Sequence, residues 1–118
     1  MAHKKKNVLC YLRTHRRLWG LTQQELAGLM GFLSASHVSR IENGKRDPTI
    51  DTVLACEVIF GVSASAIFPC AYDAIEERVM RELHRLDLTL SDTSPVDLRK
   101  RELLSSAFAR AITRPNIC

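Results

Sequence analysis

Residues 20–48 read GLTQQELAGLMGFLSASHVSRIENGKRDP, and this stretch decides the fold of the chain. It predicts two short helices joined by a turn and followed by a basic loop. Thr22 suits the N-cap of the first helix, and Glu25, three residues later, can complete a capping box. Gly31 marks the end of this helix. Between these signals, apolar residues recur at helical spacing: Leu26, Ala27 and Met30.

The second helix is expected from about Ala35 to Asn43, with two clearly different faces. At 100° per residue, Val38 and Ile41 share one side, and we expect that side to be buried. The other side is a polar stripe formed by Ser36, Ser39, Arg40 and Asn43. A short helix with this division suits the reading of base edges in the major groove of DNA.

The segment from about Leu12 to Phe68 resembles the DNA-binding domain of the phage Cro and phage repressor family of helix-turn-helix regulators. The matching residues agree in order and spacing: Arg16, Gly20-Leu21-Thr22-Gln23, Glu25-Leu26-Ala27, Gly31, Val38-Ser39-Arg40-Ile41-Glu42, Gly44, Arg46, Pro48, Gly61-Val62-Ser63 and Ile67-Phe68. The resemblance, which we place over about residues 7–69, implies a five-helix DNA-binding domain without cofactor or enzymatic step. Residues 31–36 form a turn one residue longer than usual, so the recognition helix is best numbered back from the Val38–Glu42 block.

The whole chain is predicted to be all-α, with two parts. Residues 1–70 form the helix-turn-helix domain with a basic N-terminal arm, and residues 71–118 add two C-terminal helices. Besides the two helices above, we expect helices at Asn7–Leu18, Ile50–Phe60, Ser63–Phe68, Tyr72–Leu86 and Pro95–Thr113. The core positions expected in the helix at residues 50–60 are Val53, Leu54, Val58 and Ile59. The last helix has a complete start signal in Ser94, Pro95 and Asp97.

Arg16 is an anomaly on the predicted first helix. It lies on one stripe with Val8, Leu12 and Trp19, and a buried guanidinium needs a carboxylate partner. Glu42, at the edge of the apolar side of the recognition helix, is the natural candidate, and the family resemblance implies the same pair. The alternative is a solvated Arg16 on the rim of the helix. We interpret the Arg16–Glu42 pair as structural rather than catalytic.

The charge distribution favours double-stranded DNA as the partner. The net charge is +4, and residues 1–70 hold nine Lys/Arg against five Asp/Glu, whereas residues 71–118 hold eight of each sign. The excess positive charge therefore lies in the half that carries the helix-turn-helix, where phosphate contacts need it. The run Lys4–Lys6 is either an arm along the DNA backbone or a solubilising terminus.

Two classes of DNA contact are predicted. The expected base contacts are Ala35, Ser36, Ser39 and Arg40. Arg40 is the strongest of these, because a guanidinium matches the O6/N7 edge of guanine; its alternative is a phosphate contact. The expected phosphate contacts are Gln23, Asn43, Lys45 and Arg46. For Lys45 and Arg46 the alternative is an ordinary hydrophilic turn.

Other kinds of site have little support in the sequence. The four cysteines (Cys10, Cys56, Cys70 and Cys118) lack a CxxC pair or a histidine at ligand spacing, so we expect no metal and interpret them as free thiols in a reducing cytoplasm. No apolar run approaches the ~20 residues of a membrane span, and the apolar stretch after residues 1–6 is too short for a signal peptide. The histidines and carboxylates show no catalytic arrangement.

The leading hypothesis is a sequence-specific transcriptional regulator, more specifically a repressor, that binds a pseudo-palindromic operator as a homodimer. One alternative is an antitoxin whose C-terminal helices mask a toxin; another is a protein-interaction module that has lost DNA binding. The C-terminal helices are expected to dimerise, although they could fold back on their own domain. The residues expected to be buried between the two copies are Leu83, Leu86, Leu104, Phe108 and Ile112.

Overall fold

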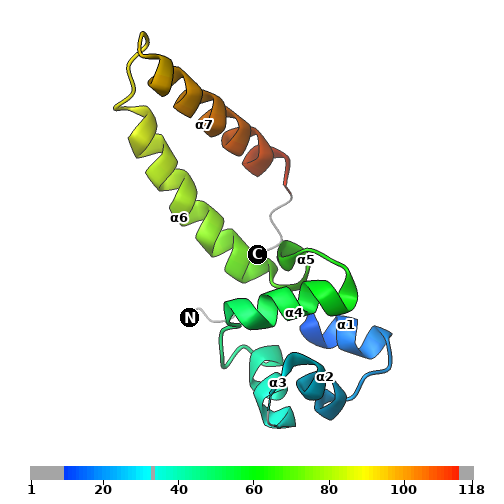
Figure 1. Cartoon of the computed structure of the whole chain (residues 1–118). Helices are drawn as coiled ribbons and strands as arrows, with labels where there is room; N and C mark the ends of the chain where they lie inside the picture. The colour runs from blue at the N-terminus through cyan, green and yellow to red at the C-terminus, as the bar shows by residue number, and fades with distance from the viewer. Residues whose placement is uncertain (1–9, 33, 115–118) are drawn as a thin grey trace. The chain divides into compact units, whose positions relative to one another are not determined.

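The computed structural model describes residues 10–32 and 34–114. In this part of the chain all regular structure is helical, as predicted (Figure 1). The helices are α1 (Leu12–Leu18), α2 (Gln23–Met30), α3 (Ala35–Glu42), α4 (Ile50–Phe60), α5 (Ala64–Ile67), α6 (Pro69–Asp87) and α7 (Pro95–Thr113). The chain divides between Tyr72 and Asp73 into two compact units, which we call the N-terminal unit and the C-terminal hairpin.

The capping box predicted for α2 is present. The Thr22 hydroxyl accepts from the Glu25 backbone N–H at 3.0 Å, and the Glu25 carboxylate accepts from the Thr22 N–H at 2.9 Å. Gly31 ends the helix in the left-handed conformation, at φ +82°, where a side chain would be strained. The long turn that follows delivers the chain to Ser34 as N-cap, and α3 starts at Ala35 as predicted.

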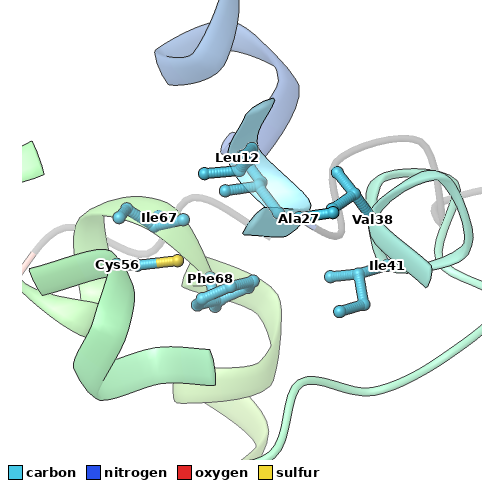
Figure 2. Packing of buried hydrophobic residues seen from close by; sticks show 8 residues of the cluster. Leu12, Ala27, Val38, Ile41, Cys56, Ile67 and Phe68 are labelled. Atoms are coloured by element: carbon cyan, nitrogen blue, oxygen red, sulfur yellow. The ribbon is translucent and has the colours of Figure 1, made fainter. Parts of the chain in front are cut away.

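One hydrophobic core holds the five helices of the N-terminal unit together. Figure 2 shows side chains from α1, α2 and α3 converging with those of the α4–α5 region. The predicted inward pair of α3 is confirmed, because Val38 is fully buried and Ile41 is 3% exposed. The complete set of buried hydrophobic residues in this cluster is Leu12, Leu26, Ala27, Val38, Ile41, Cys56, Ile67 and Phe68.

The first helix is shorter than predicted. Positions 7–9, including Val8, lie outside the described residues, and α1 begins only at Leu12 because Tyr11 has a non-helical backbone and donates its N–H to Ile67 O at 2.6 Å. At the other end the helix stops at Leu18, so Trp19 leaves the apolar stripe and is 67% exposed. The expectation that Trp19 continues the buried stripe was therefore wrong.

The bounds of α4 agree with the prediction, but its buried face does not. Leu54 and Val58 were expected in the core and are exposed, whereas Thr52 and Cys56 are buried. Apolar residues occur on most sides of this helix, so their spacing could not select the inward side. The two other residues expected in the core are half-buried, namely Val53 and Ile59.

The C-terminal hairpin consists of α7 and the part of α6 from Asp73 onward, which run antiparallel (Figure 1). The Ser94 hydroxyl caps α7 by accepting from the Asp97 N–H at 3.4 Å, with Pro95 in the first turn as predicted. Helix α6 starts earlier than expected, at Pro69, a residue that suits the first turn of a helix because it has no N–H to leave unpaired. At the open end Arg114 pairs with Asp73 and, at 2.8 Å, with Glu76.

Some of the residues that were expected to be buried between two copies of the chain lie instead in the seam between α6 and α7. Leu104 is 1% exposed, and the Phe108 ring stacks on His84 with 4.4 Å between the ring centroids. Leu104 and Phe108 therefore pack inside the hairpin rather than in an interface, because they lie on the side of α7 that faces α6. Leu86 and Ile112 remain exposed.

Replacing Leu26 by alanine is expected to destabilise the N-terminal unit by about 2–5 kcal/mol, because it leaves a cavity in the core. The matched control is Leu29→Ala on the same helix, where the side chain is exposed and the loss is expected to be about 0.5 kcal/mol or less. Urea unfolding followed by circular dichroism measures both. Equal losses in the two variants would contradict the described packing of α2.

Candidate nucleic-acid interface

A single carboxylate joins three helices of the N-terminal unit. The Glu42 side chain, at the end of α3, has no exposed area. Its Oε2 accepts from Arg16 Nε at 2.6 Å, and its Oε1 accepts from Arg16 Nη2 at 3.1 Å. The same Oε1 accepts from Gln23 Nε2 at 3.0 Å and from Arg13 Nε at 3.3 Å. Glu42 thereby connects α3 to two residues of α1 and to the first residue of α2.

Arg16 occupies the apolar side of α1 with all of its nitrogens engaged. The residue is 8% exposed, so the alternative of a solvated rim position does not describe it. Besides its two bonds to Glu42, it donates from Nη1 to Leu21 O at 3.0 Å. This bond holds the turn between α1 and α2. All three guanidinium nitrogens therefore form hydrogen bonds within the protein, and the group is not available to bind DNA.

The partners of Glu42 set its charge. Burial disfavours the ionised form, but the hydrogen bonds from Arg16, Gln23 and Arg13 outweigh it and lower the pKa of Glu42 below its ordinary value. The carboxylate is therefore charged at neutral pH, and the arrangement of α3 depends on that charge.

Arg13 and Asn43 extend this network, and the sequence analysis did not predict their contact. Arg13 Nη2 donates to Asn43 Oδ1 at 2.6 Å, and Asn43 Nδ2 donates to Ser39 Oγ at 3.3 Å. A signal was available, because Arg13 precedes Arg16 by three residues and so shares its side of the helix. Two predicted DNA contacts, Ser39 and Asn43, thus have partners within the protein.

The predicted base contacts all lie on α3, but they differ in exposure and in their hydrogen-bond partners. Ala35 and Ser39 are half-buried, and the exposed Ser36 shares a hydrogen bond of 2.8 Å with Ser34. Arg40 is exposed, and none of the described residues pairs with its guanidinium. It is therefore the long side chain of this helix that is free to reach outward.

The predicted phosphate contacts surround α3. Lys45 and Arg46 are exposed in the loop after it, and the Lys45 backbone N–H donates to Arg40 O at 2.8 Å, which fixes the start of that loop. Gln23 donates from Nε2 to Glu42 at 3.0 Å, so one of its two amide hydrogens is engaged within the protein. The capping box satisfies the Glu25 N–H and leaves the first amides of α2 as the available donors.

His37 adds no charge to this surface. Its ring stacks on Phe32, with 3.9 Å between the centroids and 9° between the planes. Desolvation and the positive charges of Arg46 and Arg40 lower the pKa of His37. The lowered pKa favours the neutral form of the imidazole, and two of its causes are positive charges on α3 and in the loop after it.

The cysteines and possible metal ligands of the described residues bear on further predictions from the sequence. They contain no group of three or more His, Cys, Asp or Glu that could hold a metal ion. Cys10 donates to Ile41 O at 3.6 Å, and burial raises the pKa of the Cys56 thiol to about 12. The expectation of free thiols holds for these two and is wrong for Cys70, which is disulfide-bonded; sequence spacing cannot reveal such proximity. None of the described helices meets the length and apolarity of a membrane span.

Replacing Arg16 by alanine is expected to destabilise the N-terminal unit by about 3–5 kcal/mol, because Glu42 would lose its main partner while remaining buried. Arg17→Ala, an exposed neighbour on the same helix, is the matched control and should change the stability by about 0.5 kcal/mol or less. Thermal and urea unfolding measure both variants. If Arg16→Ala were as stable as the control, the Arg16–Glu42 ion pair would not stabilise the N-terminal unit.

The stability of the N-terminal unit should also fall in acid. Because the pKa of Glu42 is lower in the folded chain, its contribution is complete above its ordinary value of 4.5 and is lost as the pH falls through the folded pKa. Glu42→Gln should be less stable at pH 7 and show a shallower decline below about pH 4.5. The control is Asp47→Asn, an exposed loop carboxylate. Urea unfolding between pH 7 and pH 3 gives the profiles, and parallel curves for wild type and Glu42→Gln would refute the assignment.

Comparison with known proteins agrees with this geometry. A family model described as helix-turn-helix matches residues 12–67, which are the residues of α1 to α5. Searches of curated proteins and of solved structures gave no match. The matched segment, a little under half of the chain, therefore resembles the helix-turn-helix domain of the phage Cro and repressor family of DNA-binding regulators.

Proposed function

We propose that this chain is a sequence-specific transcriptional regulator that inserts α3 into the major groove of duplex DNA. The observation that carries the proposal is the contrast between Glu42 and Arg40. Glu42 is buried and fixes α3 to α1 and α2, whereas Arg40, two residues earlier on the same helix, is exposed and unpaired among the described residues. A recognition helix needs both properties, a fixed axis and outward donors.

The polar residues around α3 divide into two roles in this proposal. Arg40 reads a guanine, with Ser36 beside it, while Ala35 and Ser39 lie closer to the protein and offer shorter contacts. Lys45 and Arg46 bind phosphates of the backbone next to the groove. The N-terminal backbone amides of α2 donate hydrogen bonds to a further phosphate. Gln23 and Asn43 support the surface mainly by holding Glu42, Arg13 and Ser39 in place.

We further propose that two copies bind a pseudo-palindromic operator and that binding represses transcription. One recognition helix contacts only a few base pairs, and regulators of this kind therefore use two half-sites about one helical turn apart. Repression needs no further machinery, because a bound dimer can block access of the polymerase to a promoter.

A protein-interaction module is the second candidate. The small side chains of Ala35, Ser36 and Ser39 favour it, since they offer little reach into a groove. The exposed cations Arg40, Lys45 and Arg46 favour DNA, because they would repel one another on a surface without an acidic partner.

Selection of bound sites from random duplex DNA, followed by mobility shifts at low and moderate salt, tests the proposal. We expect an enriched motif with two-fold symmetry and an affinity for it that exceeds the affinity for random DNA at moderate salt. Failure to enrich any motif, with no shift even at low salt, would favour the interaction module.

Arg40→Ala should weaken binding to the selected site by about 1–3 kcal/mol and relax the preference at one base pair of each half-site. The matched comparison is Arg46→Ala, which should weaken all sequences alike and flatten the salt dependence by about 0.9 per lost phosphate contact. Fluorescence anisotropy against the site and its single-base variants separates the two effects. Uniform weakening by Arg40→Ala would reassign Arg40 to the DNA backbone.

A further inference from the structure

Both helices of the C-terminal hairpin carry an apolar stripe that is not used in the seam between them. On α6 the stripe consists of Ile75, Val79 and Leu86, and on α7 it consists of Val96 and Leu103. These five side chains are 36–62% exposed, whereas Leu104, next to Leu103, is almost completely buried in the seam.

The two stripes lie on the same face of the hairpin. On the helical wheel of α6 the stripe is rotated away from the inward residues Glu76 and Leu83. On α7 the stripe is rotated away from the inward Leu104 in the same sense, when each helix is viewed from its own N-terminus. Because the helices are antiparallel, these displacements point to the same side. We call the surface made by the five residues the apolar face. Leu98 of α7, also 48% exposed, lies on the opposite face.

The hairpin lacks a core of its own that would make this face dispensable. Within its described residues, Leu104 is the one hydrophobic side chain that is fully buried. Several other contacts of the seam are ionic or aromatic, such as Arg101 with Asp87 at 3.2 Å and Phe108 with His84, and the inward Leu83 is only half-buried. Two helices joined by so few buried apolar groups need a further layer to be stable.

We infer that the apolar face packs against the same face of a second copy of this chain, so that two hairpins form a four-helix bundle. The inference deepens the proposed function, which requires two recognition helices. Ile75, Val79 and Leu86 recur at intervals of four and seven residues, which is compatible with the heptad spacing of bundle seams. From residue 73 onward the chain carries eight Lys/Arg and eight Asp/Glu, so two copies of the hairpin do not repel each other as net charges.

The charges beside the face specify the arrangement of the two copies. Glu82 borders the α6 stripe and Arg110 borders the α7 stripe, on opposite edges of the face. The contacts of Phe108 with His84 and of Arg114 with Glu76 place Glu82 and Arg110 within about one turn of each other along the hairpin. If both hairpin tips point the same way, Glu82 of each copy meets Arg110 of the other. That arrangement also brings the two unit boundaries at Tyr72–Asp73 to one end of the bundle.

The first test measures the mass of the full chain in solution by sedimentation equilibrium. The wild type is expected to be a dimer at about 10 μM, and Leu103→Glu is expected to raise the dissociation constant about 100-fold, because it places a charge in the apolar face. The matched control is Leu98→Glu, the same substitution at similar exposure on the opposite face, and it should remain dimeric. Val79→Gln provides a milder second disruption if Leu103→Glu loses helix content.

The second test exchanges charges. Glu82→Arg and Arg110→Glu should each weaken the dimer, because each places like charges opposite one another, and the double variant should recover most of the loss. Recovery supports hairpin tips that point the same way. Additive losses in the double variant would overturn that arrangement.

The outcomes separate this inference from the proposed function. A wild type that is monomeric at about 100 μM, or that dimerises equally well with Leu103→Glu and Leu98→Glu, overturns the interface even if the chain binds DNA. A monomer in which Leu103→Glu alone lowers the melting temperature overturns it too, and shows that the chain covers this face itself. A dimer that gives the expected result in both tests but binds no DNA supports the interface and contradicts the proposed function.

Discussion

The N-terminal unit depends on one buried carboxylate. Glu42 accepts hydrogen bonds from Arg16, Arg13 and Gln23, and no part of its side chain is exposed. A buried charge is costly without full pairing, so the three donors must remain where they are whenever α3 is in place. Such a pair adds less to stability than apolar packing does, but it is directional. It therefore fixes the angle and register of α3 against α1 and α2. Hydrophobic packing of Leu12, Leu26 and Val38 alone would define this orientation less strictly.

This constraint explains how the polar side chains of α3 are divided. Those at its inner edge form hydrogen bonds within the protein. Asn43 accepts a hydrogen bond from Arg13 and donates one to Ser39. Arg40, on the outer edge, has no such partner among the described residues. A surface of this kind is preorganised, because the helix and its neighbouring side chains need no rearrangement before they meet a groove. The lowered pKa of His37 fits the same picture, as nearby Arg46 and Arg40 make the surface positive.

Much of the fold could be predicted from the sequence because its signals are local. The capping box at Thr22 and Glu25 gave the start of α2, and the division between Val38 and the polar stripe gave the orientation of α3. The buried face of α4 could not be predicted, because its apolar residues surround the helix and only tertiary packing selects Cys56 over Val58. The same limit applied to the site. The Arg16–Glu42 pair follows from an arginine on an apolar stripe, but the commitment of Gln23 to Glu42 depends on a distance between two helices that no spacing encodes.

In the proposed function, a fixed α3 and the loop after it form the surface that meets DNA. The most direct measurement is a two-dimensional NMR titration of the isotope-labelled chain with the selected operator. The account predicts that the largest amide shifts occur at Ser36, Arg40 and Lys45 and at the first turn of α2, while the core amides move little. Shifts concentrated on the exposed side of α4, around Leu54 and Val58, with α3 unchanged, would contradict it.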